Sequence, residues 1–314
     1  MSRKARGFPF DTLTILMVLI LLGLAFTSLY FALSYMRVQL KGSFPPAPAQ
    51  GPAASGSSGS VPTLPADFPD SLEGVVALGK EIFMNTQNHP LSKPYVGAAM
   101  ACTSCHLNGG TEAKGLTLVG TATAFPAYSP REKAVITLQN RIGDCFMRSL
   151  NGTLPPLGGP VLVALDAYIT SLSQGLPMRM NPKSPTGPNA LKPLQVDWTQ
   201  ADPKRGQALF QAKCAVCHGQ EGQGVVGPPL WGPKSYNAGA GMADWKNLAA
   251  FIHGAMPLGN PNLTPEEARD IAAFVDSQPR PEFVLKDHLP PAQDLGVYTS
   301  KVLDEVKKVE PVKP

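Results

Sequence analysis

The sequence lacks a charge excess of either sign once its N-terminus is set aside. Its 314 residues carry 27 Lys and Arg against 23 Asp and Glu. Arg3, Lys4, Arg6 and Arg37 lie before residue 38 with one acid, Asp11, and setting these aside leaves 23 positive and 22 negative side chains. Binding to a nucleic-acid backbone requires clustered cationic charge. The near-neutral remainder therefore excludes nucleic acid as a partner.

Cysteine is scarce, and its placement is informative. Four of the five cysteines form two C-x-x-C-H motifs, Cys102 to His106 and Cys214 to His218. No second C-x-x-C stands close enough to either motif to complete a four-cysteine zinc site. At this spacing, two thiols on one helical turn attach to the haem vinyl groups and the adjacent histidine ligates the iron. The sequence predicts two haem c groups, attached through Cys102, Cys105, Cys214 and Cys217 and ligated by His106 and His218.

The fifth cysteine, Cys145, is claimed by neither motif. It lies 39 residues after His106, and Met256 lies 38 residues after His218. These matched offsets indicate an internal duplication and make Cys145 and Met256 the candidates for the second axial ligands. A thiolate donates charge to the iron, whereas a thioether is neutral. We therefore expect a low-potential first haem and a higher-potential second haem.

Other side chains compete for the axial positions. Met242 and His253 are rivals of Met256 at the second haem. His89 lies in an insertion of the first domain, where a lone loop histidine is more often solvated. Met178 and Met180 lie between the two domains, where methionine more often covers apolar surface.

Arginines surround Cys145 on a helix predicted over residues 131–150. Residues three, four or seven apart share a helix face, so Arg141, Cys145, Arg148 and Ser149 should project together. Guanidinium groups stabilise a thiolate, which lowers its pKa and favours metal ligation. The alternative is a small buried cysteine with solvated arginines around it.

The N-terminus predicts a membrane anchor. Twenty-five uncharged residues, 12–36, follow three cationic side chains, and this run is long enough to cross a hydrocarbon core of about 30 Å. The positive-inside tendency places the chain after residue 37 in the periplasm, on the outer side of a bacterial cytoplasmic membrane. A cleaved signal peptide is the alternative, although the apolar run exceeds the usual length of such segments and no clear A-x-A site closes it.

Helical spacing of apolar residues completes the expected fold, which is mainly α-helical with two tandem class I cytochrome c-like domains. Helices are expected at 71–83, 160–172, 202–210, 242–251 and 265–277, the last with a capping box at Thr264 and Glu267. The expected organisation is an anchor (1–41), a Pro/Gly/Ser-rich flexible linker (42–69), a first domain (70–178), a connector (179–201), a second domain (202–285) and a polar surface tail (286–314).

Three segments carry a resemblance to a known family. The run from Arg141 to Gly152, the run 164–169 and the run 245–252 with Met256-Pro257 resemble the dihaem thiosulfate dehydrogenases, over about residues 70–285. The resemblance implies that two thiosulfates are oxidised to tetrathionate, or tetrathionate is reduced, at a haem ligated by His106 and Cys145. It also implies that electrons leave through a haem ligated by His218 and Met256, toward an acceptor c-type cytochrome or terminal oxidase. The family's substrate-binding arginines map to Arg141 and Arg131, with Ser149 beside them.

The sequence departs from this family in two respects. Position 255 is Ala where some members have Lys before the ligand Met, so a switch between Lys and Met ligands is not available. Many members are soluble in the periplasm, whereas this chain is expected to be anchored.

Two other functions compete with thiosulfate oxidation. A tethered dihaem electron carrier would need both motifs, the anchor and Met256, but not the arginines around Cys145. A Sox-type subunit would also use a His/Cys haem, but it would need a partner subunit. The arginines around Cys145 favour thiosulfate oxidation over both alternatives. Bringing two thiosulfate dianions together requires fixed positive charge of the kind that guanidinium groups supply.

Overall fold

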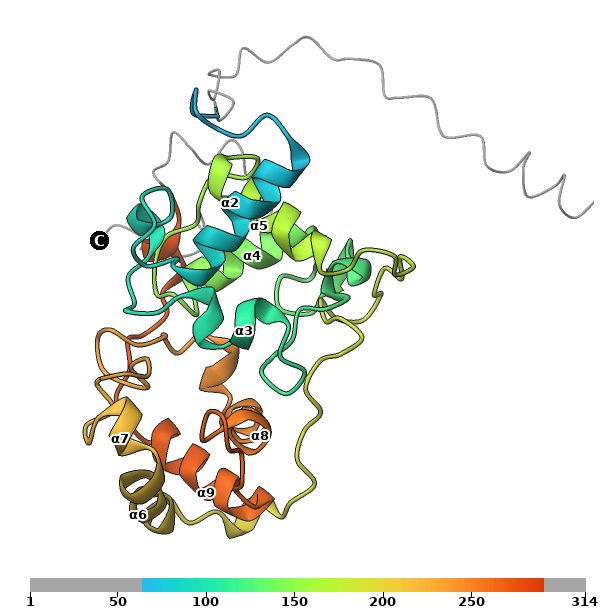
Figure 1. The fold of residues 1–314 in the computed structure, drawn as a ribbon. Helices are drawn as coiled ribbons and strands as arrows, with labels where there is room; N and C mark the ends of the chain where they lie inside the picture. Colours follow the sequence, from blue (N-terminus) through green and yellow to red (C-terminus); the bar gives the residue numbers. More distant parts are fainter. Residues whose placement is uncertain (1–63, 291–314) are drawn as a thin grey trace, which may run out of the picture. The chain divides into compact units, whose positions relative to one another are not determined.

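The computed structural model describes residues 64–290 (Figure 1). The predicted anchor at 12–36, most of the linker and most of the tail lie outside these residues. Within 64–290, no helix has both the length and the apolar character needed to cross a bilayer.

The described chain is mainly helical, as the sequence predicts. Its α-helices are α2 (Leu72–Met84), α3 (Leu107–Gly110), α4 (Leu138–Met147), α5 (Pro160–Ser171), α6 (Pro203–Lys213), α7 (Ala215–His218), α8 (Trp245–Ala255) and α9 (Pro265–Asp276). Short 3-10 helices occur at Lys93–Tyr95, Cys102–Ser104, Thr121–Ala124, Trp198–Gln200, Gly241–Ala243 and Leu285–His288. Strands β1 (Ala127–Ser129) and β2 (Ala134–Ile136) pair in antiparallel fashion.

Helices α2 and α5 form the scaffold of the first half. Ser71 caps α2 by accepting a hydrogen bond from the amide of Gly74. The two helices approach closely at Gly79, where a β-carbon would lie 2.0 Å from the carbonyl oxygen of Ala164. Phe83, on the same face of α2, is 1% exposed. The predicted packing of the 160–172 helix on the first helix is therefore confirmed.

Helix α4 is shorter than the sequence predicted. The expected helix began at residue 131, but α4 begins at Leu138, and β2 occupies 134–136. Thr137 is the reason for the late start, because its hydroxyl accepts from the amide of Asn140 and fixes the helix N-terminus. The β-branched Val135 and Ile136 precede this cap and favour the strand.

The second half repeats the scaffold with α6 and α9. Asp202 caps α6, and the predicted capping box of Thr264 and Glu267 caps α9. Gly206 of α6 lies against the backbone of Asp270 on α9, where a β-carbon would clash with the carbonyl oxygen. The helix predicted from residue 242 begins later, at Trp245, because Asp244 caps α8.

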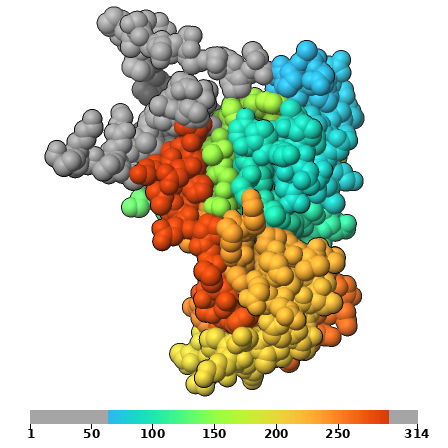
Figure 2. Space-filling view, turned by 90° about the vertical axis from the view of Figure 1, so that its left-hand side faces the viewer, coloured from blue at the N-terminus to red at the C-terminus, as the bar shows by residue number. Residues whose placement is uncertain are grey.

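The beginning of the tail packs against the first half of the described chain. In this respect it differs from the polar surface tail that the sequence predicts. The amide of Leu154 donates to the carbonyl oxygen of His288 at 2.9 Å, and His288 Nδ1 lies 2.7 Å from the carbonyl oxygen of Gly152. Leu289 is 9% exposed and packs with Leu154 and Met147. Figure 2 shows this red segment alongside green residues from the middle of the chain.

Candidate haem centres and active site

The first C-x-x-C-H motif is held by Thr86 and by a local backbone turn. The hydroxyl of Thr86 lies 3.3 Å from Cys102 Sγ and accepts from the Cys102 amide at 3.1 Å. The amide of His106 donates to the Cys102 carbonyl, which closes the turn. His106 Nδ1 is 2.6 Å from the carbonyl oxygen of Leu116, an interaction that fixes the ring and leaves Nε2 for a metal. Burial lowers the pKa of His106 to about 4, so the imidazole is neutral at pH 7.

The second motif has the same construction. The amide of His218 donates to the Cys214 carbonyl, and His218 Nδ1 lies 2.8 Å from the carbonyl oxygen of Pro228. In both motifs the carbonyl that orients the ring lies ten residues after the histidine. Burial also lowers the pKa of His218. Each motif therefore presents two cysteines and one oriented neutral imidazole, which is the protein contribution that a covalently attached haem requires.

Cys145 lies beside the first motif, although it is 40 positions from Cys105 in sequence. Burial raises the pKa of Cys105 to about 12, and the neighbouring Cys145 adds to this increase. Cys145 Sγ accepts a hydrogen bond of 3.2 Å from Arg141 Nη1, one turn earlier on α4. Cys145 is also the main cause that raises the pKa of Arg141. The sulfur is therefore paired with a buried guanidinium.

An arginine pocket of about 260 Å³ lies next to Cys145. Three of its lining residues are Arg131, Arg141 and Arg148, and Ser149 joins them. All four side chains that the sequence proposed around Cys145 thus meet in one cavity, even though Arg131 lies in the β1–β2 turn and not on α4. The remaining lining residues are Ser129, Pro130, Glu132, Asp144, Pro185 and Gly241.

Two acidic residues in the arginine pocket were missed by the sequence analysis. Burial, and then the negative charge of Asp144, raise the pKa of Glu132 to about 7. Ser129 donates a hydrogen bond to Glu132, and Asp144 lies 3.8 Å from Nε of Arg148. Asp144 adjoins Cys145 in sequence, which was an available signal, but nothing in the sequence indicated that Glu132 would lie near it.

Comparisons with known proteins match both halves of the chain. Residues 92–178 match the SoxA/TsdA cytochrome c domain, and residues 201–275 match the cbb3-type cytochrome c oxidase subunit III family. A thiosulfate dehydrogenase of Thiomonas intermedia (strain K12) is 41% identical over 220 residues, 68% of this chain and 68% of that protein. One from Allochromatium vinosum is 41% identical over 66% of this chain and 81% of that protein, and one from Stutzerimonas stutzeri is 36% identical over 73% and 75%.

The chain belongs to the thiosulfate dehydrogenase family. A solved thiosulfate dehydrogenase (TsdBA) from Marichromatium purpuratum, in its as-isolated form, is 38% identical with a TM-score of 0.61. The match covers 70% of this chain and 50% of that one, so the present chain corresponds to half of the solved protein. As a member of the thiosulfate dehydrogenase family with two cytochrome c domains, this chain is an oxidoreductase that carries two covalently bound haem c groups.

The second axial ligands of the two haems stay predictions. Met256 immediately follows α8 and packs, half-buried, against the same core cluster as Cys214. Its rival Met242 packs against the cores of both halves, and His253 Nδ1 lies 2.9 Å from the carbonyl oxygen of Leu263. The side chain of Ala255, which directly precedes Met256, is buried.

The competing side chains of the first half point elsewhere. His89 Nδ1 accepts from the amide of Leu91 in its own loop. Met178 and Met180 are 65% and 60% exposed. This exposure disfavours both methionines as ligands of a buried iron.

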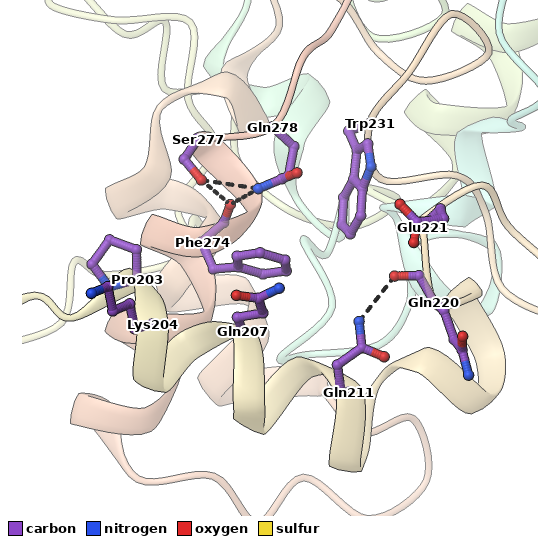
Figure 3. A pocket seen from close by; sticks show the side chains of 10 residues that line it. All are labelled: Pro203, Lys204, Gln207, Gln211, Gln220, Glu221, Trp231, Phe274, Ser277 and Gln278. Atoms are coloured by element: carbon purple, nitrogen blue, oxygen red, sulfur yellow. Dashed lines mark hydrogen bonds between the residues drawn. The ribbon is translucent and has the colours of Figure 1, made fainter.

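A larger pocket, of about 290 Å³, lies between α6 and the end of α9 (Figure 3). Four glutamines, including Gln207 and Gln211, are among its lining residues, and Gln211 donates to the carbonyl oxygen of Gln220. Trp231 and Phe274 meet edge to face at its base. Lys204 is the one basic side chain in its lining and the acidic Glu221 lies in the same lining, so this pocket has neither the cluster of arginines nor the neighbouring cysteine of the arginine pocket.

Proposed function

We propose that this protein oxidises two thiosulfates to tetrathionate in the arginine pocket, beside a haem ligated by His106 and Cys145. The observation that carries the proposal is the convergence of Arg131, Arg141 and Arg148 on one cavity next to the Cys145 sulfur. Three guanidinium groups offset the repulsion between two dianions, and their planar N–H groups suit sulfonate oxygens. Ser149 adds a neutral hydroxyl donor in the same cavity.

Cys145 takes part covalently in the proposed reaction. Its thiolate forms a bond with the sulfane sulfur of the first thiosulfate, and this step releases two electrons. The second thiosulfate then attacks the bound sulfane sulfur, the bond to Cys145 breaks, and tetrathionate leaves while the thiolate is restored. The two C-x-x-C-H motifs would hold the haem groups, which would supply the one-electron chemistry that takes up these two electrons. No proton is consumed or released, and the same steps in reverse reduce tetrathionate.

Electrons leave, in this proposal, through the haem ligated by His218 and Met256. Cys217 is exposed, and Val216 and Val226 beside it in the fold are 78% and 86% exposed. The amides of Val225 and Val226 both donate to the Cys217 carbonyl, which holds that segment next to the motif. An apolar surface at a haem edge suits a c-type cytochrome or terminal oxidase as acceptor. We place the reaction in the periplasm, with residues 12–36 as the anchor.

The direct test is an assay of the isolated dihaem protein with thiosulfate and ferricyanide. The proposal predicts that two thiosulfates disappear and two ferricyanides are reduced for each tetrathionate formed. A preparation with both haems attached that reduces ferricyanide only after dithionite treatment would contradict the proposal. It would favour the tethered electron carrier. Activity that appears only after a second protein is added would favour a Sox-type subunit.

A further inference from the structure

Tyr236 is a buried polar residue to which the proposed reaction assigns no role. It lies on the segment that precedes α8 and is 3% exposed. Its ring belongs to the core cluster of the first half, against which Cys102 and Cys105 also pack. Its hydroxyl is fully buried and donates to no acceptor among residues 64–290, although the Arg280 guanidinium, which can only donate, lies close to it. Because a buried hydroxyl that donates to nothing is destabilising, Tyr236 should meet an acceptor that the polypeptide does not supply.

Arg280 presents a second unsatisfied donor at the same place. Its guanidinium carbon lies 4.6 Å from the centroid of the Tyr236 ring. Nη2 donates to the carbonyl oxygen of Val275 at 2.9 Å, whereas Nη1 is buried without a hydrogen-bond partner in the described part of the chain. Asp276 interacts electrostatically with Arg280 but forms no ion pair with it within residues 64–290.

The backbone around both side chains is fixed. The amide of Ala238 donates to the carbonyl oxygen of Pro281, and that of Gly232 donates to Pro279. These bonds tie the Tyr236 segment to the Arg280 segment on both sides. Burial raises the pKa of Tyr236, which keeps the phenol protonated and able to donate. Two preorganised donors, one of them cationic, therefore face a common acceptor that should be an anion.

The covalently bound haems supply such anions. Each haem c brings two propionate carboxylates, and Tyr236 lies near Cys105, through which the first haem is attached. We propose that Tyr236 Oη and Arg280 Nη1 bind a haem propionate where the two halves of the chain meet. The proposal rests on the haem groups alone, so it holds whether or not the protein oxidises thiosulfate.

The charge of Arg280 determines what the test should measure. A guanidinium next to a propionate offsets its negative charge, which favours ferrous iron. Removing it should lower the midpoint potential of the haem whose propionate is bound. Arg280→Gln and Tyr236→Phe are compared with wild type by spectroelectrochemical titration of both haems, with haem content measured by the pyridine haemochrome method. Both variants should retain two haems, because the cysteines and histidines are untouched.

We expect Arg280→Gln to lower one of the two potentials and leave the other unchanged. Tyr236→Phe, which removes a single oxygen, should give a smaller shift of the same haem and alter its propionate bending mode in resonance Raman spectra. A shift at the low-potential haem assigns the propionate to the first haem, and a shift at the other assigns it to the second. Arg179→Gln and Tyr128→Phe, at exposed positions, are the matched controls.

Potentials and Raman modes that stay at the wild-type values in both variants would overturn the proposal. If Arg280→Gln and Arg179→Gln shifted the potentials of both haems by the same amount, the effect would come from net charge alone. That result would also overturn the proposal. If Arg280→Gln does not fold, Tyr236→Phe decides alone through its Raman mode. None of these measurements uses thiosulfate, so a protein without dehydrogenase activity could still confirm the propionate site.

Discussion

The two haem sites share one construction but differ in what surrounds it. In each, the histidine Nδ1 lies within hydrogen-bonding distance of a carbonyl ten residues on, and a glycine brings two helices together. At the first site, the Cys145 sulfur accepts a hydrogen bond from Arg141 and lies next to the arginine pocket. At the second, Cys217 is exposed and apolar valines stand beside it. One scaffold thus carries an arginine-lined pocket in one copy and a solvent-facing apolar edge in the other.

The largest effect should follow from removing the sulfur that distinguishes the first site. We expect Cys145→Gly to retain both haems, because Cys102, Cys105 and His106 remain. The potential of the first haem should rise once the thiolate donor is lost. Thiosulfate turnover should fall by at least about 10²-fold, the order typical of groups that act in the transition state. Tetrathionate formation with ferricyanide measures the loss, and near wild-type turnover would reduce Cys145 to a packing residue.

The next largest effect should come from the guanidinium that contacts this sulfur. Arg141→Gln keeps a side chain of similar length but removes the charge paired with Cys145. Hydrogen bonds to charged groups contribute about 1.5–3 kcal/mol, so kcat/KM for thiosulfate should fall by roughly 10-fold to 100-fold. Arg179→Gln, at an exposed position, is the control. A variant with unchanged kcat/KM would mean that thiosulfate binds elsewhere.

Replacing Met256 tests the second haem site, where the predicted axial ligand is a thioether. Met256→Lys should lower the potential of the second haem, since a neutral thioether favours ferrous iron. Electron exit to an acceptor cytochrome should slow, while KM for thiosulfate stays the same. A redox titration and a steady-state assay measure the two effects separately. An unchanged potential would point to Met242 or His253 as the ligand.

Glu132 should make the first site sensitive to pH. Its raised pKa of about 7 means that it is neutral below pH 7 and adds a negative charge to the pocket above it. One unit charge about 4 Å away contributes roughly 1 kcal/mol in water, so KM for thiosulfate should rise about fivefold between pH 6 and pH 8. Glu132→Gln should remove this dependence, and Glu112→Gln, at an exposed position, should leave it. A pH-independent KM in the wild type would contradict the assignment.

The smallest effect on catalysis should come from removing the N-terminus. A protein that starts at Val61 keeps both haem motifs and the arginine pocket, so its turnover should equal that of the full chain. The full chain should stay with membranes in carbonate or high salt, whereas the truncated form should be soluble. A mature protein that begins after residue 36 would contradict the anchor.

The sequence alone determined the haem chemistry of this protein. C-x-x-C-H motifs are local, because both thiols and the imidazole lie within five consecutive residues, so their spacing is readable without a fold. The predicted capping box of Thr264 and Glu267 is local in the same sense. Cys145 was singled out because neither motif claims it and because its offset from His106 nearly matches that of Met256 from His218.

The tertiary structure decided everything that depends on distant contacts. The β1–β2 turn and the strand at 134–136 occupy the first two turns of the predicted helix, and Arg131 lines the arginine pocket from that β1–β2 turn. Packing placed Glu132 next to Asp144, and Gly241, from the second half, lines the arginine pocket. The buried donors of Tyr236 and Arg280 were likewise assembled from segments 44 residues apart. Helical periodicity describes one element at a time, whereas these sites are formed by packing between elements.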